Sequence, residues 1–165
     1  MWQPVLTISG YILGILGLVM LIPAGLDISQ TGVEWSPFLT SAICSMFLGF
    51  SLFLSNYTKF ERINLKQAYL VTVVSWLLVG VLSAMPFYLS GVVQNKTDAF
   101  FEAFSGLTGT GATIISDVEA LPSAILLWRS LLNGLGGLGI VIFAVALLPS
   151  TYSVLLMVMV RVALS

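Results

Sequence analysis

The segment from Asp98 to Leu148 constrains the fold of this chain more than any other. It begins with a short amphipathic stretch, Asp98–Leu107, which predicts a helix too short to cross a bilayer. A loop of threonine, glycine and alanine follows at Thr108–Thr113, and an apolar run of membrane-spanning length begins at Leu121. A loop at membrane depth cannot face lipid, because its backbone N–H and C=O groups would have no partners there. We therefore expect this loop to line water or an ion path.

The composition of the whole chain supports a membrane location. Of the 165 residues, 58% are hydrophobic and 8% are charged, whereas soluble domains carry about 25% charged residues. The formal net charge is −1 and no basic patch exists, so we expect no nucleic acid partner. With no histidine and only Cys44, the chain lacks the residues for imidazole catalysis, a thiolate metal site or a disulfide framework. We predict that the protein is not an enzyme and has no cofactor.

Apolar runs define the expected topology. A membrane-spanning helix needs about 20 predominantly apolar residues, and the chain has four runs of that kind: 1–24, 37–55, 68–90 and 121–148. In the first run, glycines recur on one face at a spacing that suits close helix packing: Gly10, Gly14 and Gly17. The predicted fold is an all-α polytopic membrane protein with about four transmembrane helices, one re-entrant pore helix and a filter loop.

The charged residues predict the orientation in the membrane. Three of the six basic residues lie in the loop 56–67: Lys59, Arg62 and Lys66. By the positive-inside rule this loop is cytoplasmic. The N-terminus is then cytoplasmic too, and the connector that carries Asp27 and Glu34 lies outside. We expect a multi-pass protein of the plasma (inner) membrane.

Several features favour a cation filter over a plain turn of small residues at Thr108–Thr113. The short helix would direct its negative C-terminal end into the membrane. Gly109 and Gly111 permit the positive φ that lets successive carbonyls face one way, and loops of backbone carbonyls form cation filters. Acidic residues, Asp117 and Glu119, follow at the expected outer mouth. The predicted ion-binding residues are Thr108, Gly109, Thr110, Gly111, Ala112 and Thr113.

The last apolar run contains an arginine and a glycine cluster. A charge inside a span is costly and usually paired, so Arg129 either extends to the outer interface or pairs with Glu102 on the short helix, which would support the loop. The cluster Gly134–Gly139 formally matches a dinucleotide-binding pattern, but the strand and soluble βαβ context of such a site are missing. We interpret these glycines as allowing a bend or a close approach between helices.

Short motifs across the pore segment resemble one family of transporters. The matching stretches are Ala84–Gly91, Asp98–Ala103, Ser105–Thr108, Thr110–Thr113, Leu121–Pro122, Leu127–Ser130 and Leu135–Ile140. They resemble the Trk/Ktr/HKT superfamily of potassium and sodium transporters, and the TrkH type most closely. Members of that family have two extra N-terminal helices followed by four helix–pore helix–helix repeats around one pore.

The resemblance implies a division of the chain and an ion. Residues 1–66 correspond to the N-terminal transmembrane helix pair with its cytoplasmic loop, 67–149 to the first pore repeat, and 150–165 to an apolar tail. The central filter glycine maps to Gly111, and glycine at this place accompanies potassium permeation in HKT relatives. We therefore expect K⁺ at Gly111 and Thr110. Gly109 departs from the family, which usually has threonine there.

Partners and alternatives follow from the single loop. One loop provides one wall of a filter, so we expect other copies of the chain, or pore repeats missing from it, as partners within membrane lipid. The resemblance also implies a cytosolic nucleotide-binding regulatory subunit. Potassium transport is the leading interpretation. The alternatives are a non-conducting truncated or assembly-only membrane module and a sodium-permeable variant.

Overall fold

The structure is a computed structural model that describes residues 2–30, 35–56 and 64–141. Its helices are α1 (Trp2–Gln30), α2 (Trp35–Asn56), α3 (Leu65–Leu89), the shorter α4 (Lys96–Leu107) and a final helix, Ser123–Val141, called the last span below. All except α4 are long and apolar enough to cross a membrane. The predicted fold class, all-α with about four membrane spans and one short helix, is confirmed.

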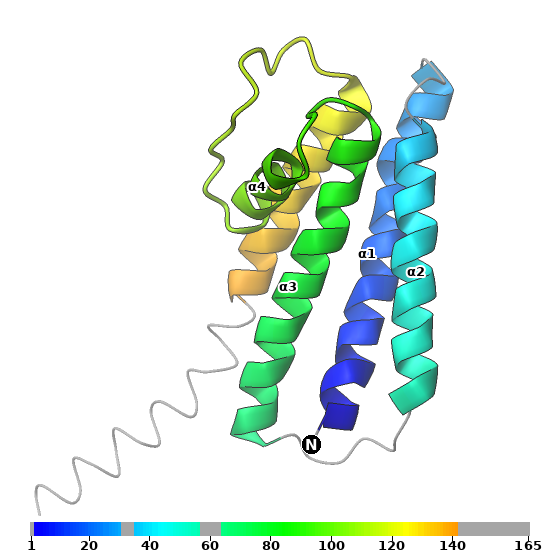
Figure 1. The fold of residues 1–165 in the computed structure, drawn as a ribbon, viewed down its shortest axis with the longest axis vertical. Helices are drawn as coiled ribbons and strands as arrows, with labels where there is room; N and C mark the ends of the chain where they lie inside the picture. The colour runs from blue at the N-terminus through cyan, green and yellow to red at the C-terminus, as the bar shows by residue number, and fades with distance from the viewer. Residues whose placement is uncertain (1, 31–34, 57–63, 142–165) are drawn as a thin grey trace, which may run out of the picture.

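The long helices stand side by side, and α4 lies against α3 and the last span (Figure 1). Helices α1 and α2 form a pair in which two glycines face each other. A Cβ atom added to Gly10 would lie 2.6 Å from the Gly49 carbonyl oxygen, and one added to Gly49 would lie 2.7 Å from the Gly10 carbonyl oxygen. Small residues allow this close backbone approach, which is how helices pack in lipid. Gly17 makes a similar contact with α2, whereas Gly14 has open space around it.

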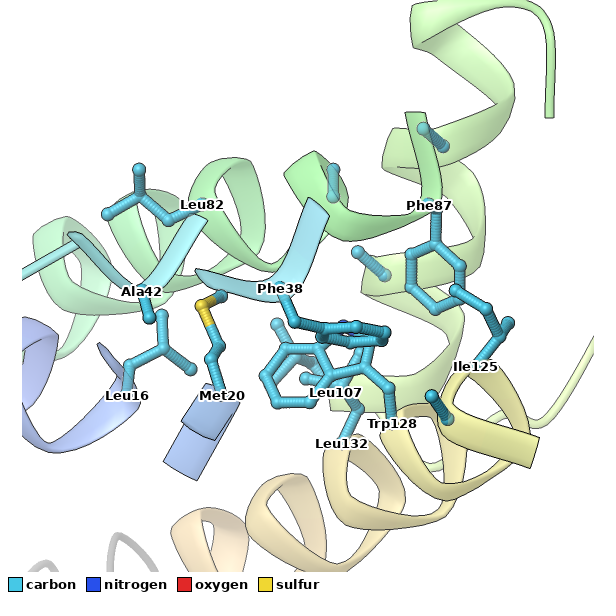
Figure 2. Close-up of a cluster of buried hydrophobic side chains, with 14 of the residues drawn as sticks. Leu16, Met20, Phe38, Ala42, Leu82, Phe87, Leu107, Ile125, Trp128 and Leu132 are labelled. Atoms are coloured by element: carbon cyan, nitrogen blue, oxygen red, sulfur yellow. The ribbon is translucent and has the colours of Figure 1, made fainter. Parts of the chain in front are cut away.

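A buried aromatic cluster joins α2, α3 and the last span. Trp128 is fully buried, and its indole Nε1 donates a hydrogen bond to the Ser83 carbonyl oxygen of α3 at 3.1 Å. The ring of Phe38 from α2 meets Trp128 edge-on, with 6.2 Å between ring centroids. Figure 2 shows Leu107 and Leu132 beside this pair, so the end of α4 is packed into the same cluster. The buried core therefore packs against the C-terminal end of α4, where the loop Thr108–Thr113 begins.

The structure corrects the predicted end of the first span. Helix α1 continues through Pro23 to Gln30, so Asp27 is a buried helical residue with 2% of its surface exposed and not part of an outer connector. Pro23 and Ala24 are also buried, and packing of this face explains why the helix continues past the proline. In the same way Pro86 lies inside α3. Most of the predicted cytoplasmic loop, Glu34 and the predicted tail 150–165 lie outside the described residues.

Candidate functional site

Helix α4 is held in place through glycines of its neighbours. The ring of Phe104 occupies the space beside Gly80 of α3, where a Cβ atom would overlap it. A Cβ atom on Gly136 of the last span would overlap the backbone of Leu107, the last residue of α4. The interpretation of the glycine cluster as a place of close helix approach is therefore confirmed at Gly136. This contact fixes the C-terminal end of α4, where the loop begins.

The first half of the loop donates its backbone N–H groups to the last turn of α4. The Gly109 N–H donates to the Gly106 carbonyl oxygen at 3.0 Å. The N–H groups of Thr110 and Gly111 both donate to the Ser105 carbonyl oxygen, at 3.0 and 3.3 Å. These bonds satisfy carbonyl groups that a helix end leaves without partners. They also fix the direction of the peptide groups in the loop.

The carbonyl groups of Thr108, Gly109 and Thr110 point away from α4. Each belongs to the same planar trans peptide as one of the N–H groups just described, so it is directed to the opposite side. Thr108 to Ala112 are all exposed, and nothing lies within 4 Å of a Cβ placed on Gly109 or Gly111. Figure 1 shows this segment on the side of the molecule away from α1 and α2. The loop thus presents a row of three carbonyls to a side that the described residues leave open.

The predicted positive φ occurs at both loop glycines. Gly109 and Gly111 each have φ of +69°, while no described non-glycine residue, Thr110 included, has a positive φ. Glycine adopts this conformation without the steric cost that a Cβ brings. Because there is space around both positions, the backbone conformation rather than crowding requires glycine here.

The second half of the loop turns its polar groups back toward α4. The Ser105 hydroxyl donates to the Ala112 carbonyl oxygen at 2.6 Å. The Thr113 hydroxyl donates to Glu102 Oε1 at 2.6 Å, and the Ile114 N–H donates to the same oxygen at 2.9 Å. Ser105 and Glu102 are three residues apart, so they share one face of α4. Ion binding by Ala112 and Thr113 stays a prediction, and here both direct a polar group to the scaffold.

Arg129 completes the support behind the loop. Its Nη1 atom lies 3.1 Å from Glu102 Oε2 and donates to the Thr113 hydroxyl at 3.0 Å. The Glu102 side chain is 1% exposed and the Arg129 side chain 17% exposed. The ion pair predicted between these residues is therefore present, and the alternative in which Arg129 only extends to the interface does not describe the structure. The network joins α4, the loop and the last span.

The Thr108 hydroxyl donates to the Phe104 carbonyl oxygen of α4 at 2.8 Å and lies 2.8 Å from the Thr110 hydroxyl. Within the described part of the chain, no group of three or more Cys, Asp or Glu side chains could hold a metal ion. A cation at this loop would therefore be held by backbone carbonyls and hydroxyls, which suit a weakly bound monovalent ion. Asp117 and Glu119 are exposed farther along the segment, and their place at an outer mouth stays a prediction.

Sequence reasoning missed Ser105 as a site residue. Its backbone and side chain together contact three consecutive loop residues, Thr110 to Ala112. The available signal was its spacing of three residues from Glu102, which places both on the face of the helix that the loop crosses.

Comparison with known proteins identifies the family of this chain. The family model TrkH, described as a cation transport protein, matches residues 36–154. The Trk system potassium uptake protein TrkH of Halomonas elongata is 35% identical over 147 residues, covering 88% of this chain and 30% of that protein. The protein of the same name from Vibrio parahaemolyticus is 34% identical over 149 residues, covering 90% of this chain and 31% of that protein.

A solved structure gives the same result. The crystal structure of the potassium transporter TrkH from Vibrio parahaemolyticus matches with a TM-score of 0.85 at 33% identity, covering 90% of this chain and 32% of that one. The chain spans less than a third of the length of these relatives. On the family model and the fold together, the chain belongs to the TrkH family of cation transport proteins.

Proposed function

We propose that this chain provides one wall of a potassium pathway across the membrane. The observation that carries the proposal is the row of carbonyls at Thr108, Gly109 and Thr110, all directed away from α4 toward an open side. Carbonyl oxygens in such a row replace the hydration shell of K⁺ in filters. Relatives named as potassium uptake proteins support the choice of ion.

The position of the loop at the end of α4 favours a cation. The C-terminus of a helix carries a partial negative charge, and the loop starts directly at this end. In this proposal Gly111 and Thr110 contact a dehydrated K⁺, together with Gly109. Thr108 contributes a carbonyl at the inner end, and Ala112 and Thr113 complete the outer end of the filter loop.

Enclosing the ion requires further walls. In our proposal these come from other copies of this chain or from further pore repeats, all within membrane lipid, and a cytosolic nucleotide-binding subunit regulates the assembly. Residues 1–66 form the N-terminal helix pair, 67–149 the pore repeat and 150–165 a separate tail. We place the protein in the inner membrane with its N-terminus and the loop 56–67 on the cytoplasmic side. The N-terminal end of α1, the C-terminal end of α2 and the N-terminal end of α3 lie at the same end of the bundle, which is consistent with that orientation (Figure 1).

The variant Gly111→Ser tests the filter assignment. A side chain at a φ of +69° is strained, so the carbonyl row should distort and the ratio of K⁺ to Na⁺ uptake should fall. The ratio is measured in proteoliposomes that contain the assembled protein. Gly91→Ser is the matched control, because Gly91 has φ of +74° and equal open space but lies between α3 and α4, outside the filter loop.

The same measurement separates the alternatives. An unchanged K⁺ to Na⁺ ratio in Gly111→Ser would count against the filter. No flux from the unmodified assembly would favour the non-conducting, assembly-only module. Equal K⁺ and Na⁺ flux in the unmodified protein would favour the sodium-permeable variant, for which the glycine at position 109 gives a reason.

A further inference from the structure

Ser105 holds the filter loop at more points than any other described residue of α4. Its carbonyl oxygen accepts the N–H groups of Thr110 and Gly111, and its hydroxyl donates to the Ala112 carbonyl oxygen at 2.6 Å. The residue is 7% exposed. Through these contacts the peptide groups reverse direction within two residues, because the Thr110 carbonyl points away from α4 while the Ala112 carbonyl points toward it.

We propose that Ser105 is a positioning residue whose hydroxyl ends the row of ion-facing carbonyls before Ala112. This inference rests on the proposed filter function. The Ala112 carbonyl and the Thr113 N–H belong to one planar peptide, so holding the carbonyl on Ser105 turns the N–H to the open side. An N–H carries a partial positive charge, which disfavours a cation at that point. The Ser105 hydroxyl therefore sets the outer limit of the cation site.

Only the orientation of the Ala112–Thr113 peptide should depend on the Ser105 hydroxyl. The next points of the loop are held independently, since the Thr113 side chain is bound by Glu102 and Arg129, and the Ile114 N–H by Glu102. On the inner side, the bonds to the Ser105 carbonyl oxygen do not involve its side chain. Removing the hydroxyl should free the Ala112–Thr113 peptide to rotate, bring a further carbonyl into the row and leave the assembly intact.

The test is the K⁺ to Na⁺ uptake ratio of Ser105→Ala in proteoliposomes of the assembled protein. A neutral hydrogen bond contributes about 1 kcal/mol, which corresponds to about a fivefold change in the balance between the two peptide orientations. A peptide that can rotate no longer holds the outer end of the site in one geometry, so discrimination between K⁺ and Na⁺ should weaken. We therefore expect the uptake ratio to fall, by at most about fivefold. A ratio does not depend on how much protein is inserted, so a loss of stability alone would not change it.

A control and a second variant keep the test decisive. Ser41→Ala removes a buried hydroxyl that donates to the Pro37 carbonyl oxygen at 2.7 Å on α2, and its ratio should equal that of the unmodified protein. Ser105→Cys keeps a weak donor, so its ratio should fall between the unmodified protein and Ser105→Ala, and it decides the matter if Ser105→Ala does not assemble.

Two results would overturn the inference. A normal ratio in the Ser105 variants together with a lowered ratio in Gly111→Ser would show that the filter exists without this role for Ser105. Normal ratios in both sets of variants would reject the filter assignment itself and the inference with it.

Discussion

Removal of the Arg129 side chain should destabilise the pore segment strongly. Its partner Glu102 is almost completely buried, with 1% of the side chain exposed. In Arg129→Ala this carboxylate would keep only the Thr113 hydroxyl and the Ile114 N–H as donors. Breaking a buried ion pair by removing one partner costs about 3–5 kcal/mol, because the remaining charge is left without compensation. We expect a loss of that size in the free energy of unfolding.

Changing the other partner, Glu102, should lower the free energy of unfolding by less. Glu102→Gln keeps an acceptor for Thr113 and Ile114, and Arg129 is partly exposed and retains the Thr113 hydroxyl as an acceptor. We expect a loss of about 1–3 kcal/mol, the penalty for a weakened buried hydrogen-bonded site. In the double variant no unpaired charge is buried. Its loss should therefore be smaller than the sum of the single losses, with a coupling energy of about 1–3 kcal/mol.

The assay is unfolding of the purified protein in mixed micelles, titrated with denaturing detergent, for the four members of this double-variant cycle. Glu119→Gln serves as a control because this carboxylate is exposed, whereas that of Glu102 is buried, and its effect should stay within about 0.5 kcal/mol. A coupling energy near zero, or equal losses in Arg129→Ala and Glu102→Gln, would refute the account of an asymmetric buried pair that supports the loop.

Two further outcomes are expected. Gly136→Ala should destabilise the protein by about 1–3 kcal/mol and lower the K⁺ flux, because the added Cβ overlaps Leu107 and must displace α4. Gly134→Ala, where nothing lies within 4 Å of the added Cβ, should leave the free energy of unfolding and the K⁺ flux nearly unchanged. Native mass spectrometry in lipid should detect a species that contains four filter loops, as copies of one chain or as repeats of a longer one; a species with a single loop under all lipid conditions would contradict the shared pore.

The sequence predicted the helices well because hydropathy over a span is a strong signal. It misplaced the C-terminal end of the first helix: the predicted span stopped at residue 24, just after Pro23, and Asp27 was assigned to a connector. The structure instead buries both residues against the core, and a tertiary contact of this kind is not visible in a local pattern. The pair between Glu102 and Arg129 could be anticipated because a charge in an apolar segment has few partners to choose from.

The loop Thr108–Thr113 lies where it was predicted, directly after the short helix, but the direction of its carbonyl groups was not predicted. The glycines at 109 and 111 indicated positive φ, and both have it. Which carbonyls face outward depends on how the loop folds back along α4, and this is decided by hydrogen bonds to Ser105 and Glu102. Residue type alone does not give the direction of a peptide plane, so Ala112 looked equivalent to Thr110.

The row of carbonyls also bears on why this segment should assemble at all. In hydrocarbon, each backbone polar group without a partner costs several kcal/mol, so Thr108, Gly109 and Thr110 cannot remain exposed to lipid. Their N–H groups and those of Gly111 are already used on α4, and rotating the carbonyls inward would break these bonds. The remaining way to stabilise the carbonyls is to enclose water or cations with other loops of the same kind. In the proposed pore, the carbonyl row that would bind the ion is then also a driving force for closing the pore.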